Sequence, residues 1–213
     1  MEKTYEEGVR ALVDIDLGIE RGELVAIVGP SGCGKSTLLN LIGCIDLPTA
    51  GTVEIDGVST RDLTDDALTK LRRDRIGTVF QFFNLLPTLS IRDNVALPLV
   101  LQHAGVRRID ARVNRTLDAV GITDKASSLP GTISGGQLQR AAIARAIVHE
   151  PAILLADEPT GNLDSRNGRS VLDILRSLAD GGQAIVMATH SAEAAARADR
   201  RVHMRDGRIQ SIS

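Results

Sequence analysis

Residues 29–36 match the phosphate-loop pattern G-x-x-x-x-G-K-[ST] in full. The apolar run of residues 24–28 comes directly before this motif, and the helix-like stretch of residues 36–42 follows it. The glycines let the backbone curl so that successive N–H groups face phosphate oxygens, and the start of the helix adds partial positive charge. The motif in this setting predicts a nucleoside triphosphate site, of a kind that kinases, GTPases, helicases and transport ATPases share.

Within the motif, we expect Lys35 to reach the β- and γ-phosphates and the Ser36 hydroxyl to bind Mg²⁺. The alternative is a glycine turn that matches by chance. At average residue usage, such a match is roughly a one-in-a-hundred event in a chain of this length, and the flanking strand and helix reduce it further. The expected nucleotide contacts of this segment are Gly29, Pro30, Ser31, Gly32, Cys33, Gly34, Lys35, Ser36 and Thr37.

Three short runs are wholly apolar: residues 24–28, 152–156 and 184–188. They do not alternate polar with apolar residues, which is typical of strands buried on both faces of a parallel sheet. A turn and a helix-like stretch follow each run. This repeated pattern predicts an α/β fold, with a P-loop NTPase core in which helices cover a parallel sheet.

Two other regions show different patterns. Residues 9–20 alternate with a period of two, and together with residues 51–56 they predict a small antiparallel layer with one face in water. Residues 201–212 read as two strands around Asp206-Gly207, which predicts a terminal hairpin. Between about residues 88 and 130 apolar residues lie at helical spacings broken by prolines and a glycine, and we interpret this segment as a helical insertion. The prediction is one domain, residues 1–213, with that insertion in its α/β core.

Composition narrows the functional class. The 213 residues carry a formal net charge of -2, so the broad basic face that nucleic-acid binding usually needs is not indicated. The two cysteines, Cys33 and Cys44, are too few for a disulfide framework and are expected to be reduced. No apolar run approaches the roughly 20 residues of a membrane span, and residues 1–5 lack the apolar core of a signal peptide. We therefore expect a cytosolic chain that a partner recruits to any membrane.

A pair of acids ends the second apolar run. Asp157 stands at the carboxyl end of the expected strand, where it could bind Mg²⁺, often through water. Glu158 follows and could polarise the attacking water as a general base. Taken alone, the pair could equally be a solvated acidic turn. Its combination with the phosphate loop favours catalysis.

A second anion site is predicted at Ser134-Gly135-Gly136-Gln137, just before the helix-like stretch of residues 138–148. A serine and two glycines at a helix start leave backbone N–H groups free for an anion. One protomer does not need two sites for one γ-phosphate. Two copies packed head to tail would use both, because each could cap the ATP of the other.

At this point the chain resembles the ABC ATPase family, and the resemblance covers almost its whole length. Residues 133–137 match the family signature, with Ile133 in place of the usual leucine. The resemblance implies that Tyr5 stacks on adenine and that Gln81 senses Mg²⁺ and the attacking water. It further implies that Asp164 lies in a dimer-facing loop and that His190 contacts the γ-phosphate.

Each of these residues also has a plainer interpretation. Tyr5 could be a surface aromatic, Gln81 a polar residue at a strand end, and His190 a helix-start residue without a ligand. Asp164 could simply cap the next helix. Cys33 looks reactive in the loop, but cysteine is common there in the family, so we interpret it as a small filler.

Within the family, residues 39–49, 68–77 and 83–89 resemble ATPases of the lipoprotein-release and macrolide-export type, which are LolD-like and MacB-like. Relatives carry a full strand before the stacking tyrosine, whereas four residues precede Tyr5 here. We therefore expect the antiparallel layer to lack its first strand.

The resemblance implies an ATPase that uses ATP and Mg²⁺, forms an ATP-dependent homodimer and drives integral membrane permease subunits from the cytoplasmic face of the membrane. Lys35, Gln81, Glu158 and His190 would be its catalytic residues, and Ser36, Gln81 and Asp157 would hold the metal. The alternatives are an ABC ATPase acting on nucleic acid or ribosomes, a P-loop kinase or GTPase, and a module that binds ATP without turnover. Neither paired cassettes nor a long coiled coil is present to favour the first, and residues 134–137 argue against the second. Glu158 and His190 argue against the third.

Overall fold

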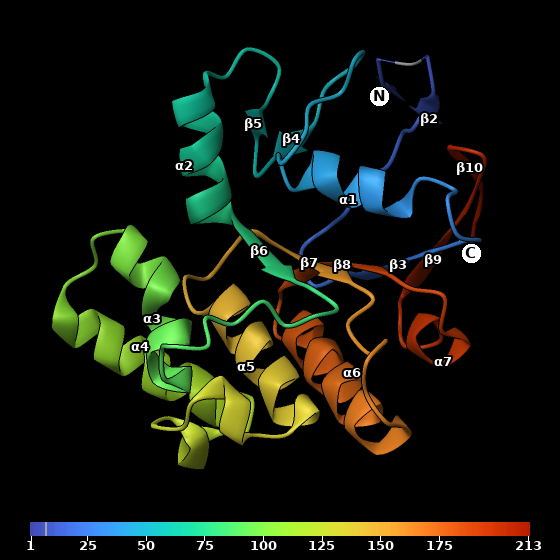
Figure 1. Ribbon diagram of the computed structural model, residues 1–213. Helices are drawn as coiled ribbons and strands as arrows, with labels where there is room; N and C mark the ends of the chain where they lie inside the picture. The colour runs from blue at the N-terminus through green and yellow to red at the C-terminus, as the bar shows by residue number, and fades with distance from the viewer. Residues whose placement is uncertain (7) are drawn as a thin grey trace.

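The structure is a computed structural model that describes residues 1–6 and 8–213. A six-stranded sheet runs through the middle of the molecule (Figure 1). β9 and β10 pair antiparallel, and the other neighbouring strands pair parallel. From edge to edge, the sheet consists of β10 (Arg208–Ile212), β9 (Arg200–Arg205), β3 (Leu24–Val28), β8 (Ala184–Ala188), β7 (Ile153–Asp157) and β6 (Ile76–Val79).

The three apolar runs form β3, β8 and β7, which are neighbours in the centre of the sheet, so this part of the sequence prediction is confirmed. Every residue of β8 is buried, as are the first four residues of β3 and of β7. Strands covered on both faces expose no face to water, so polar and apolar residues do not alternate in these segments. The expected terminal hairpin is also present, as β9 and β10.

Helices cover both faces of the sheet (Figure 1). α1 (Lys35–Ile42) and α2 (Asp65–Arg75) lie on one face, while α5 (Gly135–Ile147) and α6 (Ser165–Asp180) lie on the other. The core accordingly divides into two apolar clusters, one on each side of the sheet. A short helix, α7 (Ala192–Ala195), follows β8.

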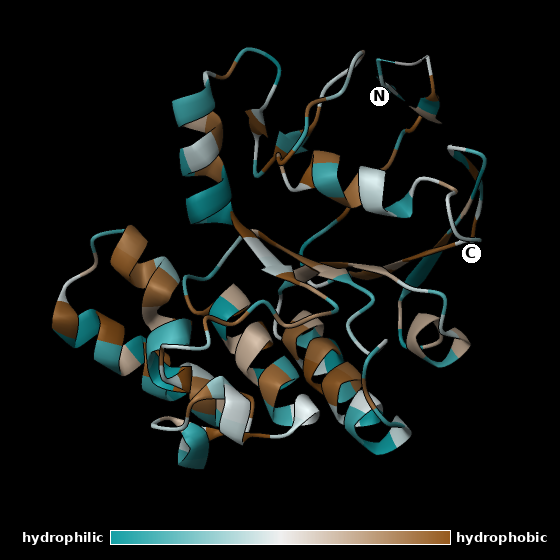
Figure 2. Cartoon of the chain, in the orientation of Figure 1, coloured by the Kyte–Doolittle hydropathy of each residue, from teal (hydrophilic) through white to brown (hydrophobic). Residues whose placement is uncertain are grey.

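The segment interpreted as an insertion contains α3 (Ile91–Leu101) and α4 (Val106–Ala119), followed by 3-10 turns at Thr123–Lys125 and Pro130–Thr132. α3 packs against α5 and α4. Figure 2 shows α4 with brown and teal residues in turn, the pattern of a helix that buries one side. In the part of the chain that the structure describes, no helix has the length and apolar character needed to cross a bilayer.

The antiparallel layer is smaller than the alternation predicted. It consists of β1 (Lys3–Thr4) with β2 (Arg10–Leu12), and β4 (Glu54–Ile55) with β5 (Val58–Ser59). The prediction that the first strand is absent was wrong, since β1 is present as two residues. The prediction of strand through residues 13–20 was also wrong, because no β-ladder forms along this segment.

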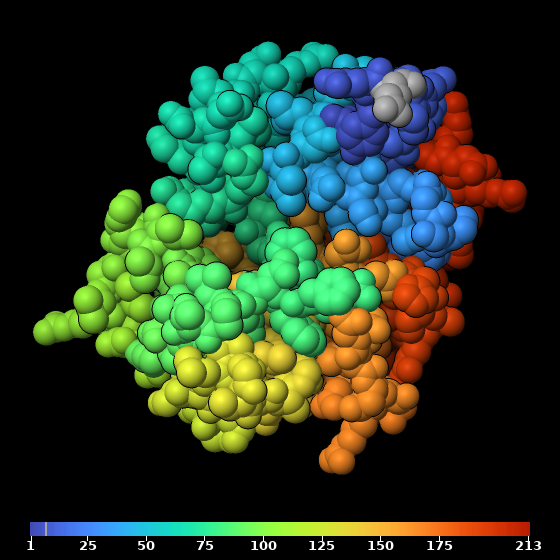
Figure 3. Space-filling model, viewed as in Figure 1, coloured from blue at the N-terminus to red at the C-terminus, as the bar shows by residue number. Residues whose placement is uncertain are grey.

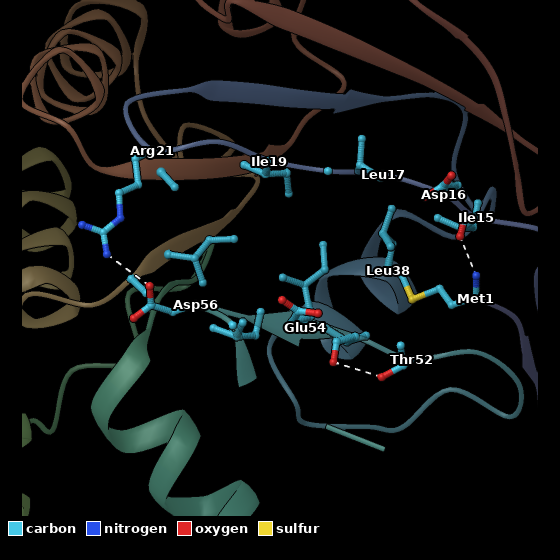
Figure 4. Close-up of a pocket in the computed structure, with 18 residues that line it drawn as sticks. Met1, Ile15, Asp16, Leu17, Ile19, Arg21, Leu38, Thr52, Glu54 and Asp56 are labelled. Carbon is cyan, nitrogen blue, oxygen red and sulfur yellow. Dashed lines mark hydrogen bonds and ion pairs between the residues drawn. The ribbon is translucent and has the colours of Figure 1, made fainter. Parts of the chain in front are cut away.

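Beside this segment lies a cavity of about 650 Å³ (Figure 4). The Arg21–Asp56 ion pair closes one end, and the Met1 amino group donates to the Ile15 carbonyl at the other. The cavity separates residues 15–19 from residues 52–57, so the two segments do not pair with each other.

The sheet and α5 approach each other closely at Gly77 of β6. A Cβ at this position would lie 2.2 Å from the Ala146 carbonyl oxygen. The Gly77→Ala variant is therefore expected to lose about 1–3 kcal/mol of unfolding free energy, the usual cost of overpacking. Urea denaturation measures the loss. The matched control is Gly18→Ala, where a Cβ meets nothing within 4 Å. Equal stability of the two variants would contradict the close packing of β6 on α5.

Candidate active site

A cleft of about 540 Å³ opens at the carboxyl ends of β3, β7 and β8. Because parallel strands end at the same edge of the sheet, their following loops converge there. Predicted site residues brought together in this cleft are Ser31, Gly32, Gly34, Lys35, Ser36, Thr37, Asp157, Glu158 and His190.

The phosphate loop joins β3 to α1 and can take its path only with glycine at two positions. A Cβ at Gly29 would lie 2.3 Å from the Met204 carbonyl oxygen. Gly34 has a φ of 105°, and its Cβ would lie 2.8 Å from the Ala11 carbonyl oxygen. Gly34 is also the N-cap of α1 and makes no side-chain cap, so the first N–H groups of the helix are left for a ligand.

Lys35 supplies the positive charge of the loop. Its Nζ donates to the carbonyl oxygens of Gly29 (2.8 Å) and Pro30 (3.0 Å). Cys33 is buried under the loop, and its Sγ lies 4.0 Å from the Lys35 Nζ. Both cysteines are free thiols.

The acid pair and the histidine come from adjacent strands. The Glu158 Oε1 lies 2.8 Å from the His190 Nδ1, and Oε2 accepts from the Thr189 hydroxyl at 3.3 Å. Glu158 has a φ of 45°, outside the region that non-glycine residues prefer, so the turn after β7 is constrained. Burial, and then the nearby Glu158 carboxylate, raise the pKa of Asp157 above its usual value, and Lys35 opposes both effects. The hydrogen bonds with Thr189 and His190, which follow β8, hold the Glu158 side chain in place.

Gln81 follows β6 but is not among the residues that line the cleft. Its Nε2 lies 3.5 Å from the Asn162 Oδ1, and the Asn162 Nδ2 donates to its carbonyl oxygen at 3.0 Å. A Cβ at Gly161 would lie 2.8 Å from the Gln81 Nε2, so the glycine makes room for this pairing. Figure 3 shows the green segment after β6 at the surface, beside the orange segment after β7.

The signature residues Ser134, Gly135, Gly136 and Gln137 also lie outside the cleft. Ser134 is the N-cap of α5 and forms a capping box: Gln137 N donates to the Ser134 Oγ at 3.4 Å, and Ser134 N donates to the Gln137 Oε1 at 2.9 Å. Asp164 is exposed and caps α6 by accepting from Asn167 N at 2.9 Å. The plainer interpretation of Asp164, a helix cap, is therefore present in the structure.

Tyr5 is 42% exposed and does not line the cleft. The Lys3 Nζ lies 5.0 Å from the centre of its ring. Sequence reasoning missed five residues that do line the cleft: Val9, Arg10, Ala11, Asp206 and Gly207. Val9 precedes β2, Arg10 and Ala11 belong to it, and Asp206 and Gly207 form the terminal hairpin turn. No phosphate-binding pattern marks them.

The arrangement defines the chemistry. A helix start and a lysine face a carboxylate pair and a histidine across one cleft, and phosphoryl transfer needs such charge neutralisation and positioning of an attacking water. The fold and the cleft are those of a P-loop nucleoside triphosphatase.

The comparisons with known proteins identify the family within that class. A family model described as "ABC transporter" matches residues 12–161. The chain is 46% identical over 98% of its length to the lipoprotein-releasing system ATP-binding protein LolD of Bordetella pertussis, and covers 92% of it. It is 47% identical to the macrolide export protein MacB of Neisseria meningitidis but spans only 32% of that protein. The chain belongs to the ABC transporter family.

Solved structures agree with this assignment. The dimeric ATP-binding cassette MJ0796, in a post-hydrolysis state bound to ADP and Pi, superposes with a TM-score of 0.89 at 44% identity, covering 100% of this chain and 95% of that one. MJ0796 comes from Methanocaldococcus jannaschii. The chain is accordingly an ATP-binding subunit of the LolD and MacB type and an ATPase. The alternative of an ABC ATPase that acts on nucleic acid is not supported.

Replacing Lys35 tests the nucleotide site directly. The Lys35→Ala variant is expected to bind ATP about 10–100-fold more weakly, since the loss of one charge-assisted hydrogen bond corresponds to that range. Fluorescence titration with a labelled ATP analogue measures the change. Lys70→Ala, which removes an exposed lysine of α2, is the control and should bind as wild type. Unchanged affinity in Lys35→Ala would show that this lysine does not contact the nucleotide.

Proposed function

We propose that two copies of this chain close around two ATP molecules and that this motion drives integral membrane permease subunits. The observation that carries the proposal is the separation of the two anion sites. Lys35, Glu158 and His190 share one cleft, whereas the signature at the start of α5, of which Ser134 is exposed, lies outside it. A second copy could bring its signature to the open side of the cleft. The relative MJ0796 has been solved as a dimer, which supports this arrangement.

In the proposed site the phosphate loop and Lys35 bind the β- and γ-phosphates of ATP. The donor set also fits Mg²⁺, because a hydroxyl (Ser36) and a carboxylate (Asp157) line the cleft, and this ion typically uses one or two protein oxygens together with nucleotide phosphates. When bound, the ion would neutralise charge on the phosphates. Gln81 is the third proposed ligand. Its side chain would have to leave the Asn162 side chain and turn into the cleft.

Glu158 is the proposed general base. Its carboxylate is oriented by His190 and Thr189, so it can accept a proton from a water that attacks the γ-phosphate. His190 is 73% exposed in its side chain, so it could also reach the phosphate from the same edge of the sheet. Tyr5 is proposed to stack on adenine and Asp164 to face the second copy.

The permease contact is proposed for the surface around Gln81 and α3. Phe82 is 72% exposed and Leu101 60% exposed, and a protein partner that covered them would remove apolar surface from water. The names of the relatives, macrolide export and lipoprotein release, support export or a mechanical coupling across the envelope. The chain would then act at the cytoplasmic face of the membrane, held there by its permease.

The Glu158→Gln variant tests the shared site. With Mg-ATP it is expected to shift from monomer to dimer in light scattering, because ATP then joins the two copies and is not consumed. Its turnover is expected to fall by about 10²–10⁴-fold, the usual contribution of a general base.

Glu20→Gln, which neutralises an exposed carboxylate outside the cleft, is the control and should keep wild-type turnover. A Glu158→Gln protein that binds ATP yet stays monomeric would contradict the ATP-dependent homodimer. Wild-type turnover in Glu158→Gln would contradict only the role of Glu158 as general base.

A further inference from the structure

The turn that follows Gln81 has an unusual backbone. Phe83 has a φ of 60° and Asn84 a φ of 51°, so two consecutive residues other than glycine are left-handed. Asparagine adopts this region with some frequency, but for a bulky residue such as phenylalanine it is a true outlier. Such a conformation persists only where neighbouring groups hold it.

Besides the backbone hydrogen bonds within the turn, Arg145 of α5 holds it from outside. Its Nη1 donates to the Asn84 carbonyl oxygen at 2.5 Å, and its Nη2 donates to the Phe83 carbonyl oxygen at 3.0 Å. The two carbonyls belong to the two left-handed residues. A planar guanidinium fork can bind both at once, whereas a lysine ammonium lacks that fixed geometry.

The charge of Arg145 has no other evident use. Among the residues that the structure describes, Arg145 forms no ion pair with a carboxylate. Burial lowers the pKa of its guanidinium, and no neighbouring acid opposes that shift. Removing a charged group from water is unfavourable unless its hydrogen bonds are replaced. The turn carbonyls supply that replacement.

Helix α5 also contacts the other side of Gln81. Gln139, which is fully buried, points its Nε2 at the Phe80 carbonyl oxygen, 3.5 Å away. The ring of Phe83 lies near the signature, since a Cβ at Gly135 would be 3.9 Å from its Cζ. The same helix therefore touches the residue before Gln81 and both residues of the strained turn after it.

We propose that Arg145 is a positioning residue for Gln81, and that it makes the Gln81 loop move as one unit with the helix that begins at the Ser134 signature. The proposal rests on the proposed role of Gln81 in hydrolysis. Arg145 stands eleven positions after Ser134, which is a rise of about 16 Å along a continuous helix. A displacement of the signature by a second copy would thus be carried along α5 to the turn after Gln81.

A double-mutant cycle on ATP turnover separates positioning from general stabilisation. Arg145→Lys keeps the charge but loses the fork, and is expected to lower kcat about tenfold while the Kd for ATP stays unchanged. In a Gln81→Ala background, the same substitution should have no further effect on kcat. Multiplicative losses in the double variant would overturn the proposal. A normal kcat for Gln81→Ala would overturn both this proposal and the role of Gln81.

Two further variants distinguish a loss of Gln81 positioning from a general folding defect. Asn84→Gly removes the cost of one left-handed residue, so it should restore part of the kcat of Arg145→Lys; no recovery would count against the proposal. Arg140→Lys alters another arginine of α5, which donates to the Ser170 hydroxyl at 2.7 Å, and should leave kcat near the wild-type value. An equal loss of kcat in Arg140→Lys would mean that any disturbance of α5 has this effect, and would overturn a specific role for Arg145.

Discussion

The parallel pairing of β3, β8 and β7 is the constraint on which the rest of the molecule depends. These strands are neighbours in the sheet although the chain forms them far apart, and their carboxyl ends lie at one edge. The phosphate loop, the acid pair and His190 each follow one of these ends. The cleft exists because three buried strands hold their loops at fixed spacing. The close packing of the apolar core therefore fixes the relative positions of the polar side chains at the site.

Several residues around the site adopt conformations that cost free energy. Glu158 has a positive φ angle at the end of β7, and Phe83 and Asn84 repeat the pattern after β6. The neighbouring structure stabilises each one: Glu158 N donates to the Ala188 carbonyl at the end of β8, and Arg145 binds the Phe83 and Asn84 carbonyls. Strain at a functional edge is thus balanced by hydrogen bonds from the buried sheet and from α5.

α5 connects two surfaces that have different tasks in the proposed cycle. Its first turn presents the Ser134 signature, and its later turns pack on β6 and α3 and hold the loop of Gln81. The close approach of Gly77 to Ala146 packs the last turn of this helix on β6. In the proposed cycle, this one helix would link the position of a second copy to the Gln81 loop.

The sequence by itself determined the local parts: which runs are buried strands, where the phosphate loop lies, and which acids and histidine end the strands. Those features are encoded within a few residues, through hydrophobic pattern, glycine spacing and capping. The tertiary structure alone decided what those parts touch. It left residues 13–20 without a strand partner, paired Gln81 with Asn162, and brought Val9, Arg10 and the 206–207 turn into the cleft. The Gln81–Asn162 contact joins residues 81 positions apart, and the cleft brings residues near the two ends of the chain together. No short-range periodicity contains that information.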